Sequence, residues 1–165
     1  MKRMQAPGLL TEAGAVQLAE TVRSDGGQLV FTNGVFDLLH PGHVRYLREA
    51  RALGDALIVG LNSDSSVRAI KGSERPIIPE EERAEVMSAL AFVDGLVIFN
   101  EETPHALIKR LQPDILVKGA DWALNAIVGR DIVEARGGKV LCMEFSPGFS
   151  TTALIKSIRK DMKGS

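Results

Sequence analysis

Hydrophobic and polar residues alternate along this chain in two different periods. Five short apolar runs have the length of buried strands, and they cover residues 29–32, 56–61, 96–99, 115–117 and 140–145. Between these runs, apolar residues recur at the three- and four-residue spacing of helices that bury one face. Strands that alternate with helices in this way indicate an α/β protein with a parallel sheet.

The helical segments complete this picture of the fold. Residues 11–24 are expected to form an extra helix before the first strand, Val44 begins a helical pattern, residues 80–82 open an acidic helix, and Ser150 opens the last helix. Residues 69–79 contain two prolines and no periodic apolar face, so we predict an irregular, mobile loop near the active site. The predicted fold class is a Rossmann-like, open, five-stranded parallel sheet with helices on both faces.

Size and composition narrow the classes of function. With 165 residues, of which 45% are hydrophobic, we expect residues 1–165 to form one domain, with a core over about residues 28–160. The 20 Lys and Arg residues balance 21 Asp and Glu residues, so we expect a small-molecule partner and no nucleic acid. No apolar run reaches the roughly 18 residues of a membrane span, and the single Cys142 lies in an apolar run, which favours the reducing cytoplasm and no membrane partner.

The candidate chemistry lies where the first strand meets the following helix. His40 and His43 flank a proline and Gly42 at this junction. The carboxyl ends of parallel strands form the ligand-binding edge of such a sheet, and a helix N-terminus there offers N–H groups and a positive dipole end to phosphate. Gly34 and Gly42 allow the backbone to approach a ligand closely. Two imidazoles three residues apart can therefore point at one phosphate chain.

Capping, packing and zinc binding suit the two histidines less well than phosphate binding does. A lone histidine usually caps a helix or packs, but a pair at this junction is a more specific pattern. His40 and His43 lack a third ligand at zinc-like spacing, so no protein-bound metal is expected. The first strand is not followed by Gly-x-Gly-x-x-Gly, and the chain contains no Gly-Lys-Ser/Thr phosphate loop.

These features together resemble the cytidylyltransferase-like superfamily, whose signature is such a strand followed by a His-x-Gly-His turn. Within it, the chain is similar to the adenylyltransferases of D-glycero-β-D-manno-heptose 1-phosphate, and we expect it to be a free-standing domain. The similarity rests on residues 31–37, 62–64, 71–72, 75–76, 117–121 and 150–152. It implies transfer of AMP from ATP to a heptose 1-phosphate, a role in lipopolysaccharide core or related glycans, and a homo-oligomer.

The resemblance also suggests roles for individual residues. We expect His40, His43 and Lys71 to be catalytic, and Lys71 and Arg75 to be cations that close over the acceptor phosphate, unless they belong to a merely solvated loop. The expected nucleotide-binding residues are Thr32, Asn33, Gly34, Phe36, Lys118, Asp121, Ser150, Thr151 and Thr152. The hydroxyls at 150–152 can also cap the last helix. Trp122 could stack on a base or pack. Arg83 resembles the arginine on the family's corresponding helix, but we expect it to pair with neighbouring Glu residues.

The expected mechanism needs no general base. A sugar phosphate has its second ionisation near pH 6, so its oxygen is already largely anionic at neutral pH. Catalysis then depends on positioning and charge neutralisation, with Mg²⁺ held mainly by the triphosphate. Asp37 is the nearest carboxylate, and we expect it to fix the turn without assigning it to the metal.

Two alternatives differ in substrate or in class. One is a cytidylyltransferase acting on glycerol 3-phosphate or another polyol or sugar phosphate, and the other is a non-catalytic nucleotide-sensing domain. The glycerol-phosphate enzymes carry one arginine before the Ser-Thr-Thr turn and another near position 91, where this chain has Ala91. Losing two guanidinium groups from a phosphate-rich site favours a different acceptor and base.

Overall fold

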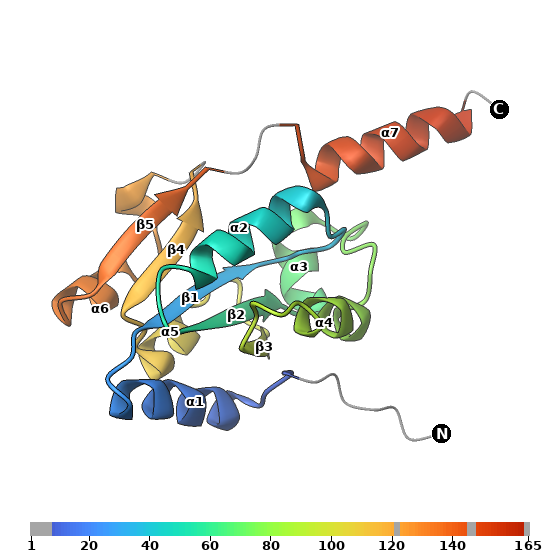
Figure 1. Cartoon of the computed structure of the whole chain (residues 1–165). Helices are drawn as coiled ribbons and strands as arrows, with labels where there is room; N and C mark the ends of the chain where they lie inside the picture. The colour runs from blue at the N-terminus through green and yellow to red at the C-terminus, as the bar shows by residue number, and fades with distance from the viewer. Residues whose placement is uncertain (1–7, 121–122, 145–147, 164–165) are drawn as a thin grey trace, which may run out of the picture.

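The computed structural model of the chain describes residues 8–120, 123–144 and 148–163. Its strands form one parallel sheet with the order β3-β2-β1-β4-β5 (Figure 1). The strands are β1 (Leu29–Gly34), β2 (Ala56–Asn62), β3 (Gly95–Phe99), β4 (Ile115–Gly119) and β5 (Lys139–Met143). The predicted five-stranded parallel sheet is therefore confirmed, with strand limits within two residues of those expected.

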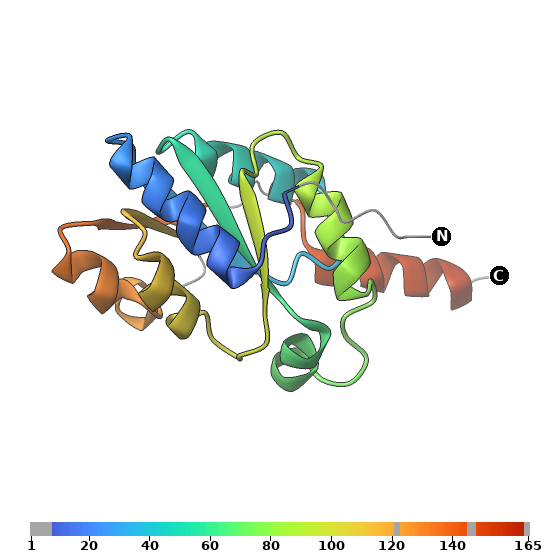
Figure 2. The ribbon, with the colours of Figure 1, turned by 90° about the horizontal axis from the view of Figure 1, so that it is seen from below.

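Helices cover both faces of the sheet, as predicted (Figures 1 and 2). On one face, α1 (Glu12–Ser24), α5 (His105–Leu111) and α6 (Arg130–Ala135) pack in a core with Phe31 and Ile58. On the other face, α2 (Pro41–Arg51) and α4 (Glu80–Ser88) pack in a core with Leu57 and Val59. The chain also forms α3 (Asp64–Lys71), the short η1 (Leu124–Ala126) and α7 (Thr151–Lys163). In the described ranges, no helix is long and apolar enough to cross a membrane.

The extra helix before the first strand is present as α1. Thr11 is its N-cap, and the Thr11 hydroxyl accepts a hydrogen bond from the N–H of Gly14 at 3.1 Å. Ala15 and Ala19 are fully buried on the inner side of the helix. Their small side chains let α1 lie close against the sheet, next to α5 (Figure 2).

Strand order defines one switch point in the sheet. From β1 the chain proceeds through β2 to β3 on one side, and it then crosses to place β4 and β5 on the other side. β1 consequently pairs with both β2 and β4, with Phe31 opposite Ile58 and Leu116. In an open α/β sheet, ligands bind beyond the carboxyl ends of the strands at such a point, which here lies between β1 and β4.

The segment expected to be irregular begins later than predicted. Ala69 to Lys71 form the last turn of α3, and only residues 72–79 form an irregular connection to α4. Ser63 caps this helix by accepting a hydrogen bond from the N–H of Ser66 at 3.2 Å. The buried residues of α3 are Ser66 and Val67, so this short helix leaves no periodic apolar pattern in the sequence.

Candidate active site

A cavity of about 290 Å³ lies at the switch point between β1 and β4. Residues from the end of β1 and the turn after it, from α2, from the end of α3 and the following connection, from the end of β4 and from the start of α7 line it. The predicted site residues among them are Asn33, Gly34, Phe36, His43, Lys71, Arg75, Lys118 and Thr151. Segments far apart in sequence thus bring most of the candidate residues to one place.

The local structure of the histidine turn has a simple cause. His40 is the N-cap of α2 and has extended backbone angles (φ −136°, ψ 167°). Its Nδ1 accepts a hydrogen bond from the backbone N–H of His43 at 3.3 Å, and Pro41 occupies the first helical position. Because Nδ1 is the acceptor, a neutral His40 carries its proton on Nε2, where it can be donated to a ligand.

Gly42 is required by the packing of the two imidazole rings. The rings of His40 and His43 are stacked, with centroids 3.7 Å apart. A Cβ atom at position 42 would lie 2.9 Å from Cε1 of His40 and 3.0 Å from Cβ of Phe149. A glycine at this position is therefore what allows the His40 ring to fold back over the helix N-terminus.

Both histidines are poised in the neutral form. Burial and, to a smaller extent, the neighbouring His40 lower the pKa of His43 to about 4, although the backbone of Leu38 opposes this shift. Burial also lowers the pKa of His40, against a smaller opposing effect of its own backbone. Nδ1 of His43 is buried without a hydrogen-bond partner of normal geometry in the part of the chain that the structure describes. A phosphate anion beside the rings would stabilise their charged forms and raise both pKa values.

Cationic side chains from three elements border the same cavity. Lys71 is the exposed last residue of α3, and Arg75 follows in the connection to α4. On β4, Nζ of Lys118 donates a hydrogen bond to Oδ1 of Asn33 on the neighbouring β1. Positive groups that converge with the His43 imidazole on a strand-end cavity create a site for a polyanion such as a triphosphate.

Asp37 fixes the cation beside it. Its fully buried carboxylate accepts hydrogen bonds from Nε of Arg75 at 2.7 Å and from the N–H groups of Ile77 and Ile78 at 2.9 and 2.8 Å. Burial alone would raise the pKa of Asp37, but the two amides and the Arg75 guanidinium outweigh it, so the pKa is lowered. Asp37 is therefore an anion that anchors residues 75–78, in agreement with its expected role in fixing the turn.

The described residues do not provide a metal site of their own. No group of three or more His, Cys, Asp or Glu side chains in these ranges could hold a metal ion. The carboxylate of Asp37, which borders the cavity, is already engaged by Arg75 and two backbone amides.

Comparison with known proteins decides the family. The sequence profile described as "Cytidylyltransferase-like" matches residues 31–158. The chain belongs to the cytidylyltransferase-like family. This membership confirms the prediction of a nucleotidyltransferase at the level of the family, and the matched residues include the whole histidine turn.

Relatives and solved structures agree with this family. The chain is 55% identical over 135 residues to the bifunctional protein HldE of Citrifermentans bemidjiense, and 54% identical over 150 residues to that of Geotalea uraniireducens. These alignments cover 82% and 91% of this chain but 28% and 30% of the relatives, so the chain spans less than a third of their length. A crystal structure of the lipopolysaccharide core biosynthesis protein from Thermoplasma volcanium is 31% identical with a TM-score of 0.59, and covers 73% of this chain and 98% of its own.

Some residues expected at the site of this cytidylyltransferase-like chain lie elsewhere. The side chain of Thr32 is fully buried, its Oγ1 lies 2.8 Å from the Tyr46 hydroxyl and it donates to the Val117 carbonyl at 2.9 Å. This hydroxyl therefore connects β1 to β4 and α2, and Thr32 is not among the residues that line the main cavity. His40 borders a second cavity of about 420 Å³, beside Arg45.

The start of α7 divides the predicted hydroxyl cluster. The Thr151 hydroxyl borders the main cavity and donates to the Leu38 carbonyl at 3.4 Å. Ser150 caps α7 by accepting a hydrogen bond from the N–H of Ala153 at 3.3 Å, and Thr152 is exposed. Asp121 and Trp122 lie outside the described residues.

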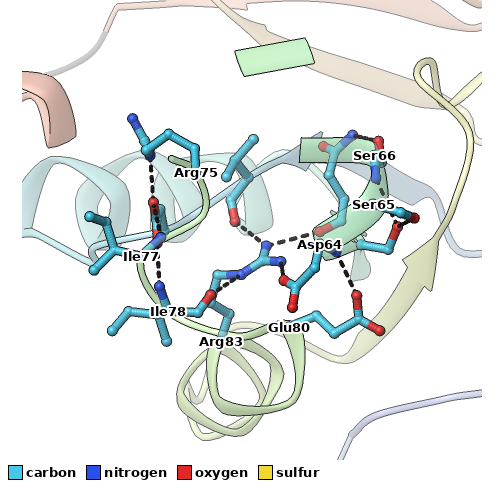
Figure 3. Close-up of polar contacts among 12 residues, drawn as sticks. Asp64, Ser65, Ser66, Arg75, Ile77, Ile78, Glu80 and Arg83 are labelled. Carbon is cyan, nitrogen blue, oxygen red and sulfur yellow. Dashed lines mark hydrogen bonds and ion pairs between the residues drawn. The ribbon is translucent and has the colours of Figure 1, made fainter. Parts of the chain in front are cut away.

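Arg83 is the residue whose environment was predicted wrongly. Its side chain is fully buried and pairs with Asp64, not with the neighbouring Glu residues (Figure 3). The sequence does contain a signal, since Arg83 shares the buried side of α4 with Ala84 and Met87. An arginine within such an apolar pattern indicates a buried polar network.

Proposed function

We propose that this chain is an adenylyltransferase that transfers AMP from ATP to D-glycero-β-D-manno-heptose 1-phosphate and releases ADP-heptose and pyrophosphate. The proposal rests on one cavity at the switch point of a cytidylyltransferase-like fold. His43, Lys71, Arg75 and Lys118 all line this cavity. The choice of heptose rests on the sequence motifs that resemble heptose 1-phosphate adenylyltransferases and on 51–55% identity to HldE proteins.

The reaction is a single displacement at phosphorus. An oxygen of the acceptor phosphate forms a bond to the α-phosphorus of ATP, the bond from that phosphorus to the bridging oxygen breaks, and pyrophosphate leaves with the electron pair. The acceptor oxygen is already largely anionic at neutral pH, so no proton has to be removed. Asp37, held as an ion by Arg75, is accordingly not used as a base.

Each group in the cavity then has a role in binding or charge stabilisation. His43 contacts the triphosphate and stabilises charge on the departing pyrophosphate, with His40 stacked behind it. Lys71 bridges the acceptor and nucleotide phosphates, and Arg75 binds the acceptor phosphate. Asn33, Gly34, Phe36, Lys118 and Thr151 contact the nucleotide. Mg²⁺ would be held mainly by the triphosphate and would supply positive charge to its phosphate oxygens.

The place of this reaction in the cell is part of the proposal. We place it in the synthesis of lipopolysaccharide core or related heptose glycans, which the similarity to the lipopolysaccharide core biosynthesis protein of Thermoplasma volcanium supports. The compartment that we propose is the cytoplasm. The chain acts as one domain, and as a homo-oligomer.

Pyrophosphate release tests the proposal directly. ATP, CTP and GTP are each combined with heptose 1-phosphate and with glycerol 3-phosphate, and the product is identified by its mass. We expect ATP with heptose 1-phosphate to give the highest kcat/KM. Preference for CTP with glycerol 3-phosphate would replace the substrate assignment by the cytidylyltransferase alternative, which the similarity to HldE proteins does not favour. Tight nucleotide binding with no release from any pair would support a sensor.

A further inference from the structure

We propose that Arg83 is a positioning residue that sets Lys71 and Arg75 relative to the histidine turn, and so controls binding of the acceptor phosphate. The proposal rests on the proposed function of the cavity. Arg83 has a fully buried side chain on α4 and is not among the residues that line the main cavity. Any effect on the reaction therefore acts through other residues.

The guanidinium group of Arg83 joins four separate segments (Figure 3). Nη1 donates to the carbonyl of Val35, in the turn after β1, at 2.7 Å, and to the carbonyl of Asn62, at the end of β2, at 2.9 Å. Nη2 pairs with the carboxylate of Asp64 at 2.7 Å, and Nε donates to the carbonyl of Ile78 at 2.9 Å. A planar group with donors in several fixed directions suits this task, whereas an ammonium group does not.

The first connection leads from Arg83 to Lys71. Asp64 is the first residue of α3 and Lys71 is the last, so the ion pair fixes the beginning of the helix that carries the cation. The N–H of Asp64 also donates to the carboxylate of Glu80, which opens α4. α3 is therefore attached at its start to α4 by two charged side chains, and this sets where its last residue lies.

The second connection leads from Arg83 to Arg75. Both backbone polar groups of Ile78 are hydrogen-bonded. The carbonyl of Ile78 accepts a hydrogen bond from Arg83, and its N–H donates one to the Asp37 carboxylate at 2.8 Å. The same Asp37 carboxylate accepts from Nε of Arg75. The segments that carry Lys71 and Arg75 are thus both anchored by one buried guanidinium group. The same group also binds the carbonyl of Val35, in the turn that leads to the histidines.

Variants at Asp64 test the first connection without removing the buried arginine. The Asp64 side chain is 24% exposed, so Asp64→Asn is expected to fold while it loses the ion pair. We expect KM for heptose 1-phosphate to rise by roughly tenfold, as for a modest misplacement of a binding group, while equilibrium affinity for ATP changes by less than about twofold. Asp64→Glu should restore most of the acceptor KM. Glu85→Gln, exposed on α4, is the matched control with no expected change.

A second variant and a double variant separate positioning from general destabilisation. Arg83→Lys should raise the acceptor KM in the same way as Asp64→Asn. If Asp64 acts through Lys71, Asp64→Asn should have little further effect on acceptor KM in a Lys71→Ala background. Multiplicative effects of the two substitutions, or an unchanged acceptor KM in both single variants of a protein that turns over heptose 1-phosphate, would overturn the proposal.

A readout without turnover keeps this test independent of the proposed function. Trypsin can cleave the chain after Lys71, at the end of α3. Loosening of α3 predicts faster cleavage of the Lys71–Gly72 bond in Asp64→Asn and Arg83→Lys than in the wild type and in Glu85→Gln. Equal cleavage rates would refute the anchoring by Arg83. Absence of pyrophosphate release from the wild type would instead refute the proposed function and leave the cleavage result to decide the anchoring.

Discussion

The imidazole rings of His40 and His43 lie stacked, with centroids 3.7 Å apart and ring planes 18° from parallel. Two protonated imidazoles at this distance repel each other, which agrees with the part that His40 plays in lowering the pKa of His43. Without a ligand, the pair is neutral at neutral pH. A triphosphate beside His43 would therefore change the charge state of the pair as well as gain hydrogen bonds from it.

Removing either ring should reduce turnover without unfolding the chain. We expect His43→Ala and His40→Ala to lower kcat/KM by two to four orders of magnitude, roughly the effect of losing a major electrostatic contact to a transition state. Pyrophosphate release and circular dichroism measure the two quantities. His105→Ala is the control, because His105 is exposed at the start of α5. A folded double variant with near-normal release would contradict the assignment.

Gly42→Ala should disturb the stack while both histidines remain. The added Cβ would lie 2.9 Å from Cε1 of His40 and 3.0 Å from its Nδ1, so the ring has to move. We expect at least a roughly tenfold fall in kcat/KM, since small misplacements of binding groups are costly.

Gly14→Ala is the matched control for this substitution. A Cβ atom at position 14 makes only ordinary contacts, the nearest being 3.4 Å from Oγ1 of Thr11. Because Gly14 lies in α1, alanine there should leave activity unchanged and raise stability by roughly 0.5–1 kcal/mol. Wild-type activity in Gly42→Ala would show that the stacked geometry is not needed.

Stability should depend on His43 in a defined pH window. The pKa of His43 is about 4 in the folded chain, against 6.5 for the ordinary side chain. Between these values the unfolded chain binds a proton that the folded chain does not, so the free energy of unfolding decreases as the pH falls from 6.5 towards 4. Above pH 6.5 the contribution of neutral His43 to the free energy of unfolding is fully present. Urea unfolding of the wild type and of His43→Asn at several pH values measures this contribution.

The comparison between the two proteins isolates His43 from other titrating groups. The difference in unfolding free energy should be constant above pH 6.5 and should shrink or change in favour of the variant as the pH approaches 4. Asp37 has a lowered pKa, so its own contribution is lost below about 3.8 and outside this window. Parallel curves for the two proteins from pH 7 to pH 4 would disprove the assignment of the shift to His43.

The parts of this molecule that sequence predicts well are those with local signals. β2 is buried at every residue and is a continuous apolar run from residue 56 to 61, and the histidine turn carries its own cap, proline and glycine. The partners of Arg83 could not be predicted, because all four come from other segments and the Glu residues near it in sequence suggest surface pairs. The partners of the Thr32 hydroxyl could not be predicted for a related reason, because Tyr46 and Val117 come from other segments.

The lack of a local signal also explains why the sequence did not predict α3. A helix of eight residues, Asp64–Lys71, buries too few side chains for a periodic pattern, and it depends on Ser63, Glu80 and Arg83 at its start. Lys71, its last residue, therefore resembles part of a loop when only the sequence is considered. In the structure Lys71 lines the cavity from the end of a helix.

Lys71 and Arg68 offer a matched test of this assignment, since both are exposed cations in the last turn of α3 and only Lys71 lines the cavity. We expect Lys71→Ala to reduce kcat/KM by roughly two orders of magnitude or more, because a cation between two phosphates is lost. Arg68→Ala removes the same charge and should leave turnover within about twofold. Both substitutions should change the free energy of unfolding by less than about 0.5 kcal/mol, as exposed changes usually do. Pyrophosphate release and urea unfolding on the two variants decide the matter: equal losses of activity would mean that the net charge of α3, and not the position of Lys71, supports the reaction.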